Sequence, residues 1–336
     1  MKKSTERACF IINPKAAAGL AGRNISKLES AIATVFEEFR IYQTKAPKHA
    51  TELAKKACIE GFDIIVSVGG DGTCHEVING LIENDQLINP KVTFAVVPIG
   101  TGSDLIKSLH TPKDLLPALK YAAFGEKRSL DVGKAIVSSE QEVNSSTVEE
   151  ISKDTKYFLN VAGFGANGEV VRRANSSNKR LGGRITFMQA TVHTSLTYNS
   201  PKARVRVFDD TNEDPKLLWE EELLSCFVAN GSYCGGGMWV APKGSMKNGK
   251  LDISLLSKKS VLGQIRDLRH LYNGTIDQVR EATCVRGTKV IAEPLRNETI
   301  RIDLDGELSG ILPASFDILP QMLSVRAKWN ATSSLP

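Results

Sequence analysis

The first 130 residues alternate short apolar runs with longer segments whose apolar residues recur at helical spacing. Strands separated by helices are typical of layered α/β folds, because two parallel strands can be joined only by a long crossover. The alternation therefore predicts an α/β N-terminal domain with a mostly parallel sheet and flanking helices. Its strands are expected at residues 8–13, 39–44, 63–68 and 92–98.

The rest of the chain has a different pattern, in which β-rich runs are separated by Gly, Pro and Asn. Two helical stretches interrupt these runs, at residues 166–198 and 261–272. Short strands joined by turn residues favour an antiparallel, sandwich-like domain. Because 336 residues exceed what one hydrophobic core usually covers, we expect two domains, an α/β domain over 1–130 and a β-rich domain over 131–330.

Composition places the chain among ordinary globular proteins, since 41% of its residues are hydrophobic and 24% are charged. The net charge of +5 is too small to indicate a nucleic-acid partner, so we expect none, but it is compatible with anionic substrates or lipid surfaces. The six cysteines contain no C-x-x-C spacing, which favours reduced thiols in a cytoplasmic protein.

No segment has the pattern of a membrane span. The longest uncharged stretch, residues 223–242, contains Asn230 and three consecutive glycines, which a lipid-exposed helix would tolerate poorly. The apolar run at residues 8–12 is too short for a signal peptide. Any membrane contact is therefore expected to be peripheral.

A glycine-rich turn follows the third expected strand, in the sequence Gly69-Gly70-Asp71-Gly72-Thr73. Thr73 lies three residues before Glu76, which is the spacing of a capping box and predicts the start of a helix. A glycine turn between a strand and a helix collects unpaired backbone N–H groups and the positive end of the helix dipole, an arrangement that suits a phosphate. Because Asp71 would repel a bare phosphate, the turn favours a phosphate that carries Mg²⁺.

A second glycine turn follows the fourth expected strand, at residues 98–104, and ends at Asp104. Parallel strands present such turns at the same carboxyl edge of the sheet, where open α/β folds bind their ligands. Asp71 and Asp104 would then meet at one metal-phosphate site. Either turn by itself is also compatible with a tight connection that binds nothing, and it is the pair that favours the site.

These blocks resemble those of the diacylglycerol kinase-like lipid kinases, a family that includes the sphingosine and ceramide kinases. The family's G-G-D-G-T-x-N-E-V-x-N-G block matches residues 69–80, with His75 in place of Asn. Its P-x-G-T-x-N-D block matches residues 98–104, with Ser103 in place of Asn. The remaining matches follow in the family's order at residues 13–19, 44, 163–170 and 235–242.

The resemblance implies ATP-dependent phosphorylation of a lipid hydroxyl, most simply that of diacylglycerol, which gives phosphatidic acid. The first domain would bind the nucleotide and the second domain the lipid, with ATP in the cleft between them. Asp71 and Asp104 would organise Mg²⁺ through water. The residues implied to line the nucleotide are Asn13, Pro14, Lys15, Thr44, Gly69, Gly70, Asp71, Gly72, Thr73, Cys74, His75 and Thr101.

The sequence Asp305-Gly306-Glu307 matches the family's D-G-E element, whose carboxylates face the acceptor hydroxyl. By itself, Asp-Gly between apolar runs predicts only a hairpin turn. In the context of the other blocks, Glu307 is expected to be the general base that takes the proton of the hydroxyl, with Asp305 as the alternative.

A further family segment, D-G-x-L-D, holds a structural divalent ion partly through backbone carbonyls, and it matches residues 248–252. The residues implied to hold the ion are Ser245, Asn248 and Lys250. Hard cations prefer charged oxygen, and Asn248 replaces the leading carboxylate by an amide. A polar turn without a metal ion is therefore the alternative.

Two basic segments lie in the second domain. Val261, Ile265 and Leu268 recur at helical spacing among lysines and arginines, and we expect this apolar face to pack on the second domain, with a lipid surface as the alternative. The other segment favours a solvated helix face over contact with anionic lipid. Its cations are Arg172, Arg173, Lys179, Arg180 and Arg184. The expected partner is a lipid substrate at a membrane surface, and a homodimer is left open.

Two other functions fit part of the sequence. The G-G-D-G-T turn also occurs in NAD kinases, which phosphorylate a soluble dinucleotide, but the blocks at 98–104 and 235–242 favour a lipid kinase. A catalytically silent regulator that binds nucleotide or lipid is suggested by the departures from the family pattern at residues 75, 103 and 248. The retained Asp71, Asp104 and Glu307 favour an enzyme.

Overall fold

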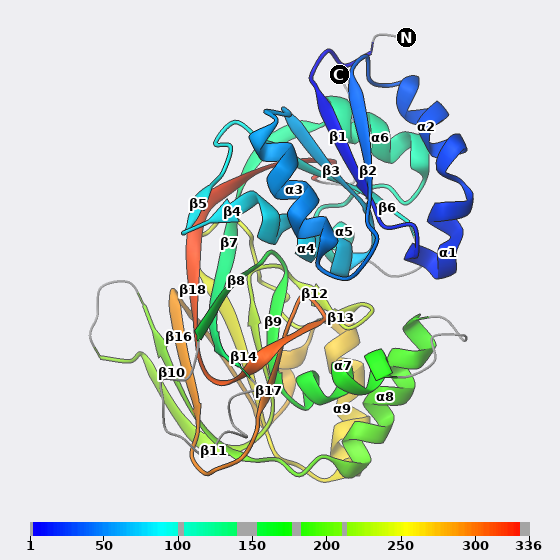
Figure 1. The fold of residues 1–336 in the computed structure, drawn as a ribbon. Coiled ribbons are helices and arrows are strands. Elements are labelled where there is room, and N and C mark those ends of the chain that lie inside the picture. Colours follow the sequence, from blue (N-terminus) through cyan, green and yellow to red (C-terminus); the bar gives the residue numbers. More distant parts are fainter. Residues whose placement is uncertain (1–2, 100–103, 140–152, 177–182, 210–213, 330–336) are drawn as a thin grey trace. The chain divides into compact units, whose positions relative to one another are not determined.

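The computed structural model describes residues 3–99, 104–139, 153–176, 183–209 and 214–329, and the chain divides into two compact units (Figure 1). Unit 1 consists of Met1–Asp131 and Pro320–Pro336, and unit 2 of Val132–Leu319. The second domain expected from the sequence extended to residue 330, whereas unit 2 ends at Leu319. The difference arises because the last strand of the chain continues into unit 1 and pairs there.

Unit 1 alternates strands and helices. Its elements in chain order are β1 (Ala8–Ile12), α1 (Ala16–Arg23), α2 (Ile25–Ala33), β2 (Phe39–Gln43), α3 (His49–Ile59), β3 (Ile64–Gly69), α4 (Asp71–Leu81), β4 (Ile82–Glu83), β5 (Gln86–Leu87), β6 (Thr93–Pro98), α5 (Asp104–Ser108), α6 (Leu115–Phe124), the first part of β7 (Glu126–Ser138) and the last part of β18 (Glu307–Ala327). The central strand β1 pairs in parallel with β2 and β3. Strand β6 pairs in parallel with β3, and the end of β18 pairs in parallel with β6.

Helices cover both faces of this sheet (Figure 1). Alternate side chains on one face, including Phe10, Val66 and Val97, share a buried core with α2 and α6. Their neighbours along the strands, such as Ile11 and Ile65, point to the other face and are also fully buried, because α3 and α4 pack there. Strands that are buried on both faces appear in a sequence as continuous apolar runs.

Unit 2 has the β-rich, antiparallel architecture expected from the sequence. Its elements in chain order are the rest of β7, β8 (Lys153–Phe158), β9 (Val161–Gly165), α7 (Ala166–Ser176), α8 (Gly183–Thr197), β10 (Lys202–Phe208), β11 (Leu217–Ala229), β12 (Tyr233–Cys234), β13 (Met238–Trp239), β14 (Leu251–Ser257), α9 (Val261–Asn273), the 3₁₀ turn η2 (Ile276–Gln278), β15 (Ala282–Gly287), β16 (Lys289–Pro294), β17 (Arg301–Leu304) and most of β18.

The long strand β11 organises unit 2. Its first half pairs with β10, and its second half pairs with β14 on one side and with β9 on the other. These strands enclose a core in which Phe158, Phe164 and Phe316 are fully buried. The rings of Phe164 and Phe316 stack with their centroids 5.8 Å apart. The core of unit 2 therefore lies between strands that are distant in the sequence.

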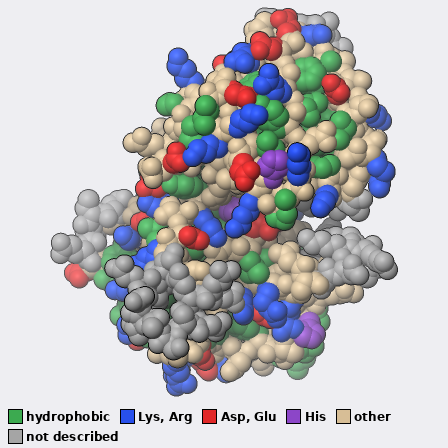
Figure 2. Space-filling model, viewed as in Figure 1, with side chains coloured by type: hydrophobic (Ala, Val, Ile, Leu, Met, Phe, Trp, Pro, Cys, Tyr) green, Lys and Arg blue, Asp and Glu red, His purple; other side chains and the backbone are tan. Residues whose placement is uncertain are grey.

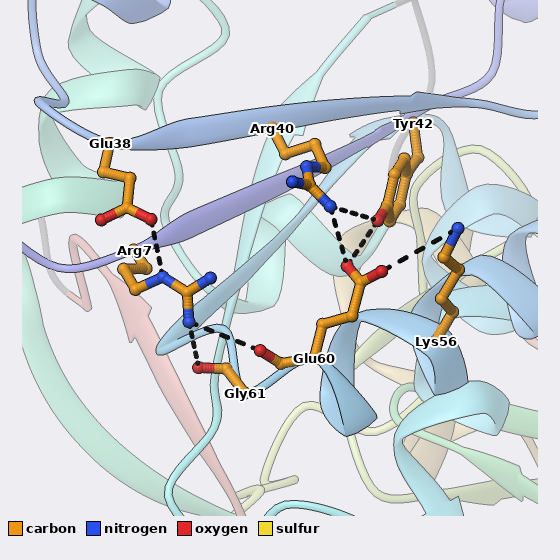
Figure 3. A network of polar contacts seen from close by, with 7 residues as sticks. All are labelled: Arg7, Glu38, Arg40, Tyr42, Lys56, Glu60 and Gly61. Carbon is orange, nitrogen blue, oxygen red and sulfur yellow. Dashed lines mark hydrogen bonds and ion pairs between the residues drawn. The ribbon is translucent and has the colours of Figure 1, made fainter.

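A polar network ties the C-terminal end of α3 to the edge of the sheet in unit 1 (Figure 3). The Glu60 carboxylate accepts a hydrogen bond from the Tyr42 hydroxyl at 2.5 Å and lies 3.4 Å from the Arg40 guanidinium. Arg7 donates to the backbone carbonyls of Glu60 and Gly61 at 3.4 and 3.3 Å. Exposed ion pairs contribute only about 0–1 kcal/mol each, so the network mainly fixes where α3 ends.

Charges of both signs are mixed on the surface. On the face drawn in Figure 2, Lys and Arg side chains are interspersed with Asp and Glu, in keeping with the small net charge. Within the described part of the chain, no helix is long and apolar enough to cross a membrane.

Candidate functional site

The carboxyl ends of the parallel strands in unit 1 meet at one edge of the sheet. Asn13 follows β1, Thr44 follows β2, and Gly69 ends β3. The N–H of Asn13 donates to the carbonyl of Val68 at 3.2 Å, and the N–H of Thr44 donates to that of Ile12 at 2.9 Å. The strand ends are thus held side by side, at the edge where open α/β folds bind their ligands.

Two glycines form the turn between β3 and α4, which begins at Asp71. The capping box expected from Thr73 and Glu76 is wrong, because the helix starts two residues before Thr73. The Thr73 hydroxyl instead accepts a hydrogen bond from Asn13 Nδ2 at 3.4 Å. Thr73 also explains the need for glycine at position 69, since a Cβ atom there would lie 2.5 Å from its hydroxyl oxygen.

The Glu76 carboxylate closes the N-terminus of a neighbouring helix, α3. Its Oε1 accepts a hydrogen bond from the N–H of Lys48 at 2.9 Å, and its Oε2 accepts one from the N–H of Ala50 at 3.0 Å. The Thr51 hydroxyl donates to the backbone carbonyl of Glu76 at 2.9 Å. A negative charge at the positive end of the helix dipole stabilises the start of α3.

The Asp71 carboxylate closes the N-terminus of a second neighbour, α5, which begins at Asp104. Its Oδ2 accepts a hydrogen bond from the N–H of Asp104 at 2.9 Å, and its Oδ1 accepts one from the N–H of Leu105 at 3.2 Å. The Asp104 carboxylate is buried and pairs with Lys107 Nζ at 2.7 Å. The structure thereby confirms that the segments carrying Asp71 and Asp104 meet.

The other residues implied to line a nucleotide lie around the same edge, apart from Thr101, which falls outside the described residues. Pro14 and the exposed Lys15 lead from β1 into α1. Cys74 and His75 have exposed fractions of only 1% and 8%. Both residues lie within α4, and the N–H of Cys74 donates to the carbonyl of Gly70 at 3.1 Å.

The three helices α3, α4 and α5 differ in what lies at their N-termini. Helices α3 and α5 each carry a carboxylate that comes from α4, Glu76 and Asp71 respectively. The N-cap of α4 is Gly70, which has no side chain of its own to cap the helix. A helix N-terminus that is reached over two glycines can bring its backbone N–H groups close to an anion such as phosphate.

The Asp305-Gly306 pair in unit 2 forms the hairpin turn expected from the sequence. Leu304 at the end of β17 pairs with Glu307 at the start of β18. Both turn residues have positive φ, 52° and 86°, as in a type I′ turn. The turn thereby places Glu307, whose side chain is exposed, next to Asp305 at the tip of the hairpin.

The Asp305 carboxylate anchors the segment that joins β8 to β9. Its Oδ1 accepts hydrogen bonds from the N–H groups of Asn160 at 2.9 Å and Val161 at 3.0 Å. Its Oδ2 accepts one from the N–H of Leu159 at 3.0 Å. All three donor residues are buried, so Asp305 satisfies backbone groups that water does not reach.

A third acid, Asp303, lies inside unit 2 beneath the same hairpin. It sits on β17, where it pairs with Gly163 of β9, and only 8% of it is exposed. Burial raises the pKa of Asp303 to about 8, and the negative charge of Asp305 adds to this shift. Asp303 therefore keeps its proton at neutral pH, although an ordinary aspartate is ionised there.

The segment implied to hold a structural ion is closed by its own hydrogen bonds. Asn248 Oδ1 accepts a hydrogen bond from the N–H of Lys250 at 3.0 Å, and Lys250 Nζ pairs with Asp209 at 2.9 Å. Within the described ranges, no three or more His, Cys, Asp or Glu side chains are grouped to hold a metal ion. The Asn248 amide oxygen and the Lys250 ammonium thus have partners within the protein, and the ion site with Ser245 and its alternative, a polar turn, both stay predictions.

Part of the basic segment after β9 is neutralised. Arg172 and Arg173 of α7 pair with Glu169 at 2.6 and 2.9 Å. The hydrogen bond from Arg172 lowers the pKa of Glu169. Lys179 and Arg180 lie outside the described residues. Arg301 also lies 3.5 Å from the same carboxylate, so this helix face has internal ion pairs but keeps a net positive charge.

Three side-chain roles in these sites were not predicted from the sequence. The pairing of Asp104 with Lys107 has a local signal, because residues three apart on a helix are neighbours. The burial of Asp303 has no such signal, because alternation with apolar residues along a strand places its side chain on the opposite face and would predict exposure. The capping of α3 by Glu76 has none, because the N–H groups that it accepts from lie 26 and 28 residues earlier in the chain.

Comparisons with known proteins match both units. The family model of the diacylglycerol kinase catalytic domain matches residues 7–135. The model of the YegS C-terminal NAD kinase beta sandwich-like domain matches residues 160–327. Each model therefore covers one part of the chain, in the order that the sequence motifs indicate.

Relatives of the full length are known. A diacylglycerol kinase of Bacillus subtilis (strain 168) is 26% identical over 312 residues, which are 93% of each chain. One of Staphylococcus aureus (strain JH9) is 26% identical over 328 residues, 96% of this chain and 92% of the relative. A crystal structure of a Bacillus anthracis protein matches at 25% identity with a TM-score of 0.73, covering 99% of this chain and 98% of its own.

Proposed function

Because this chain belongs to the diacylglycerol kinase-like family of lipid kinases, we propose that it transfers the γ-phosphate of ATP to the free hydroxyl of diacylglycerol, which gives phosphatidic acid. The observation that carries the proposal is the turn at the carboxyl edge of the parallel sheet in unit 1. There β3 ends at Gly69 and leads over Gly70 into the N-terminus of α4, and Asp71 joins this turn to the segment that carries Asp104. The phosphates of ATP would occupy that position.

The nucleotide site would be built from the turn residues of unit 1. Gly69 and Gly70 let the phosphates approach the backbone, and Thr73 and Asn13 are already joined by a hydrogen bond beside them. The exposed Lys15 can add a positive charge near the phosphates.

The acids of this edge suit a magnesium ion. Mg²⁺ in kinase sites is usually held by one or two carboxylates together with phosphates and water, so a cluster of three acids is not required. The Asp71 carboxylate accepts N–H groups of Asp104 and Leu105, which holds the two acids close to one another at this edge. Asp71 and Asp104 would hold the ion through water, and when bound it would offset the negative charge of the phosphates.

Unit 2 would supply the general base. The acceptor oxygen forms a bond to the γ-phosphorus as the bond from that phosphorus to the ADP oxygen breaks, and the hydroxyl proton must leave. Asp305 already accepts three backbone N–H groups, whereas Glu307 is exposed at the start of β18. We therefore assign to Glu307 the role of the general base that accepts the hydroxyl proton.

The decisive experiment incubates the purified chain with labelled ATP and a total lipid extract, and identifies the labelled product by mass. Parallel reactions contain diacylglycerol in detergent or NAD in buffer. The proposal expects phosphatidic acid from the first two reactions and none of the phosphorylated dinucleotide. Labelled NADP alone would overturn it in favour of an NAD kinase, and no product in any reaction would favour a silent regulator.

Glu307→Gln tests the assignment of the base. Because general-base help is worth about 10²–10⁴ in rate, kcat should fall by at least about 10²-fold. The KM for ATP should change little, since Glu307 does not hold the nucleotide. Steady-state kinetics with diacylglycerol micelles measure both values, and a raised ATP KM with unchanged kcat would assign Glu307 to binding.

A further inference from the structure

Helix α9 in unit 2 carries an outer face of unusual composition. None of the residues of this helix is buried, and its large exposed side chains recur on one side of it. They are Leu262, Ile265, Arg266, Arg269 and Tyr272, and this set is named the α9 face. Leu262 is 81% exposed, Ile265 49% and Tyr272 45%. The sequence placed Ile265 on a packed apolar face, which is wrong, because the side chain points outward.

The inner side of α9 explains why the helix is oriented in this way. Its one acidic residue, Asp267, pairs with Lys259, and Lys259 also meets Glu281 at 2.6 Å. Leu271 packs against a small core of unit 2. The Ser260 hydroxyl caps the helix by accepting a hydrogen bond from the N–H of Gly263 at 3.3 Å. An ordinary surface helix buries its apolar stripe and exposes its charges, whereas α9 turns its carboxylate inward and exposes leucine and isoleucine.

A hollow of about 440 Å³ adjoins the N-terminal end of the α9 face. Leu262 and Arg266 line it from the face itself, and Lys258 lines it from the preceding segment. Lys258 pairs with Glu222 at 3.0 Å, and both side chains are 45% exposed. Cationic groups therefore stand beside the most exposed leucine of the described residues.

We propose that the α9 face is the surface by which this enzyme docks on a bilayer of anionic phospholipid. Leu262 and Ile265 would enter the acyl boundary, Arg266 and Arg269 would meet the phosphate groups, and Tyr272 would lie at the interface. An interfacial helix is defined by such a mixture of apolar and basic side chains. The two arginines of the α9 face complement the negative surface potential of such a bilayer.

The occupant follows from chemistry and from the proposed function, on which this inference rests. Arg266 lies 3.3 Å from Asp267, and Glu281 lines the same hollow, but both carboxylates also pair with Lys259. The three cations Arg266, Arg269 and Lys259 therefore outnumber the two carboxylates beside them, so a neutral bilayer or a second copy of the same cationic face complements the α9 face poorly. The acceptor lipid resides in a membrane, and no helix of the described residues can span one. The chain must therefore reach its substrate from the surface.

Sedimentation with vesicles tests the proposal and requires no turnover. The full chain is mixed with vesicles of phosphatidylcholine alone or with a third of phosphatidylglycerol. Wild type should bind the anionic vesicles more tightly, and Leu262→Ser with Ile265→Ser should weaken binding by at least about tenfold, since each buried aliphatic side chain favours the apolar phase. Arg266→Gln with Arg269→Gln should weaken it by about tenfold on anionic vesicles only, and less at high salt.

The matched control is Lys216→Gln with Leu218→Ser. It removes a half-exposed lysine and a leucine that is 57% exposed at the start of β11, away from α9 in the chain. This variant should bind vesicles as wild type does, and thermal unfolding should show that all variants remain folded. A loss of binding equal to that of the α9 variants would mean that any surface change has the effect, which overturns the proposal.

Two further results separate this inference from the proposed function. Turnover of diacylglycerol in detergent should be nearly unchanged in the α9 variants, because a micelle does not have to be found and bound as a bilayer does. If no lipid is phosphorylated and the α9 variants still lose vesicle binding, the function fails and the docking surface stands. Equal vesicle binding by wild type and variants overturns the docking surface. If binding is equal and size-exclusion chromatography shows that wild type is a dimer and the variants are monomers, the α9 face is instead a contact between two copies of the chain.

Discussion

Asp71 in unit 1 and Asp305 in unit 2 occupy similar positions in unrelated folds. Each lies next to a glycine just after the end of a strand, and each carboxylate accepts backbone N–H groups from a segment distant in the chain. They differ in what they hold. Asp71 is half-buried and closes the N-terminus of α5, whereas Asp305 satisfies three buried N–H groups between β8 and β9.

The difference separates two uses of a carboxylate. Around Asp71 the neighbouring acid, Asp104, is buried and paired with Lys107, so Asp71 is the more accessible oxygen donor for a ligand. Around Asp305 the neighbouring acid, Glu307, is the exposed one. Under the proposed function, Asp71 would combine an anchoring and a ligand role, while in unit 2 Asp305 would anchor and Glu307 would act on the substrate.

Asp71→Ala should have the largest effect. It removes the proposed link to Mg²⁺ and both hydrogen bonds to α5, so kcat/KM with diacylglycerol micelles should fall by about 10³-fold. Loss of the cap should also lower the free energy of unfolding by about 1 kcal/mol. The control is Asp114→Ala, which removes an exposed aspartate at the N-cap of α6 that makes no capping hydrogen bond. Near-normal turnover of a folded Asp71 variant would refute the ligand role.

Asp305→Ala should affect stability most strongly. A buried N–H group that loses its acceptor costs about 1–3 kcal/mol where water cannot take the place of that acceptor. With three such groups at the low end of this range, the free energy of unfolding should fall by about 3 kcal/mol. Glu307→Ala, two residues away and exposed, should change it by less than about 0.5 kcal/mol. Urea denaturation measures both. Similar values for the two variants would remove the distinction between the anchor and the base.

Much of this arrangement is visible in the sequence, because it depends on local chemistry. The strands of unit 1 are continuous apolar runs, and the Asp-Gly pair at residues 305–306 specifies a type I′ turn with positive φ at both positions. The glycines before α4 likewise mark a turn from strand to helix. Such signals depend on residues that are close together in the chain.

The partners of the acids could not be predicted in this way. Thr73 and Glu76 satisfy the local rule for a capping box, yet Glu76 finds N–H groups of α3 that only the folded sheet brings near. The hydrogen bond from Asp71 to α5 crosses 33 residues for the same reason. The pairing of the end of β18 with β6 of unit 1 was not predicted, because an isolated apolar run does not reveal which sheet it joins.

Asp303→Asn should remove a pH dependence of stability. The folded state keeps the proton of Asp303 up to about pH 8, whereas the unfolded chain loses it near pH 4. As pH rises between these values the unfolded state binds fewer protons, so the free energy of unfolding falls, by at most about 1.4 kcal/mol per pH unit. The variant should therefore gain stability relative to wild type from pH 5 to pH 8. Thermal unfolding of both proteins measures this at each pH. If the unfolding temperatures of wild type and variant differ by the same amount throughout this range, Asp303 is already ionised in the folded wild type.

Glu76→Gln should have the smallest effect. It compares two carboxylates of α4, Glu76, which only anchors a neighbouring helix, and Asp71, which is also proposed to bind the ligand. The amide keeps one acceptor oxygen and loses the charge at the N-terminus of α3, so the free energy of unfolding should fall by about 1 kcal/mol. Glu52→Gln, in the first turn of α3 with a side chain 79% exposed, is the matched control and should cost less. Because Glu76 holds α3 and not the turn at Gly69 and Gly70, kcat/KM should stay within about threefold of wild type. A loss as large as that of Asp71→Ala would mean that the position of α3 governs the nucleotide site, and the anchoring and ligand roles would then be inseparable in unit 1.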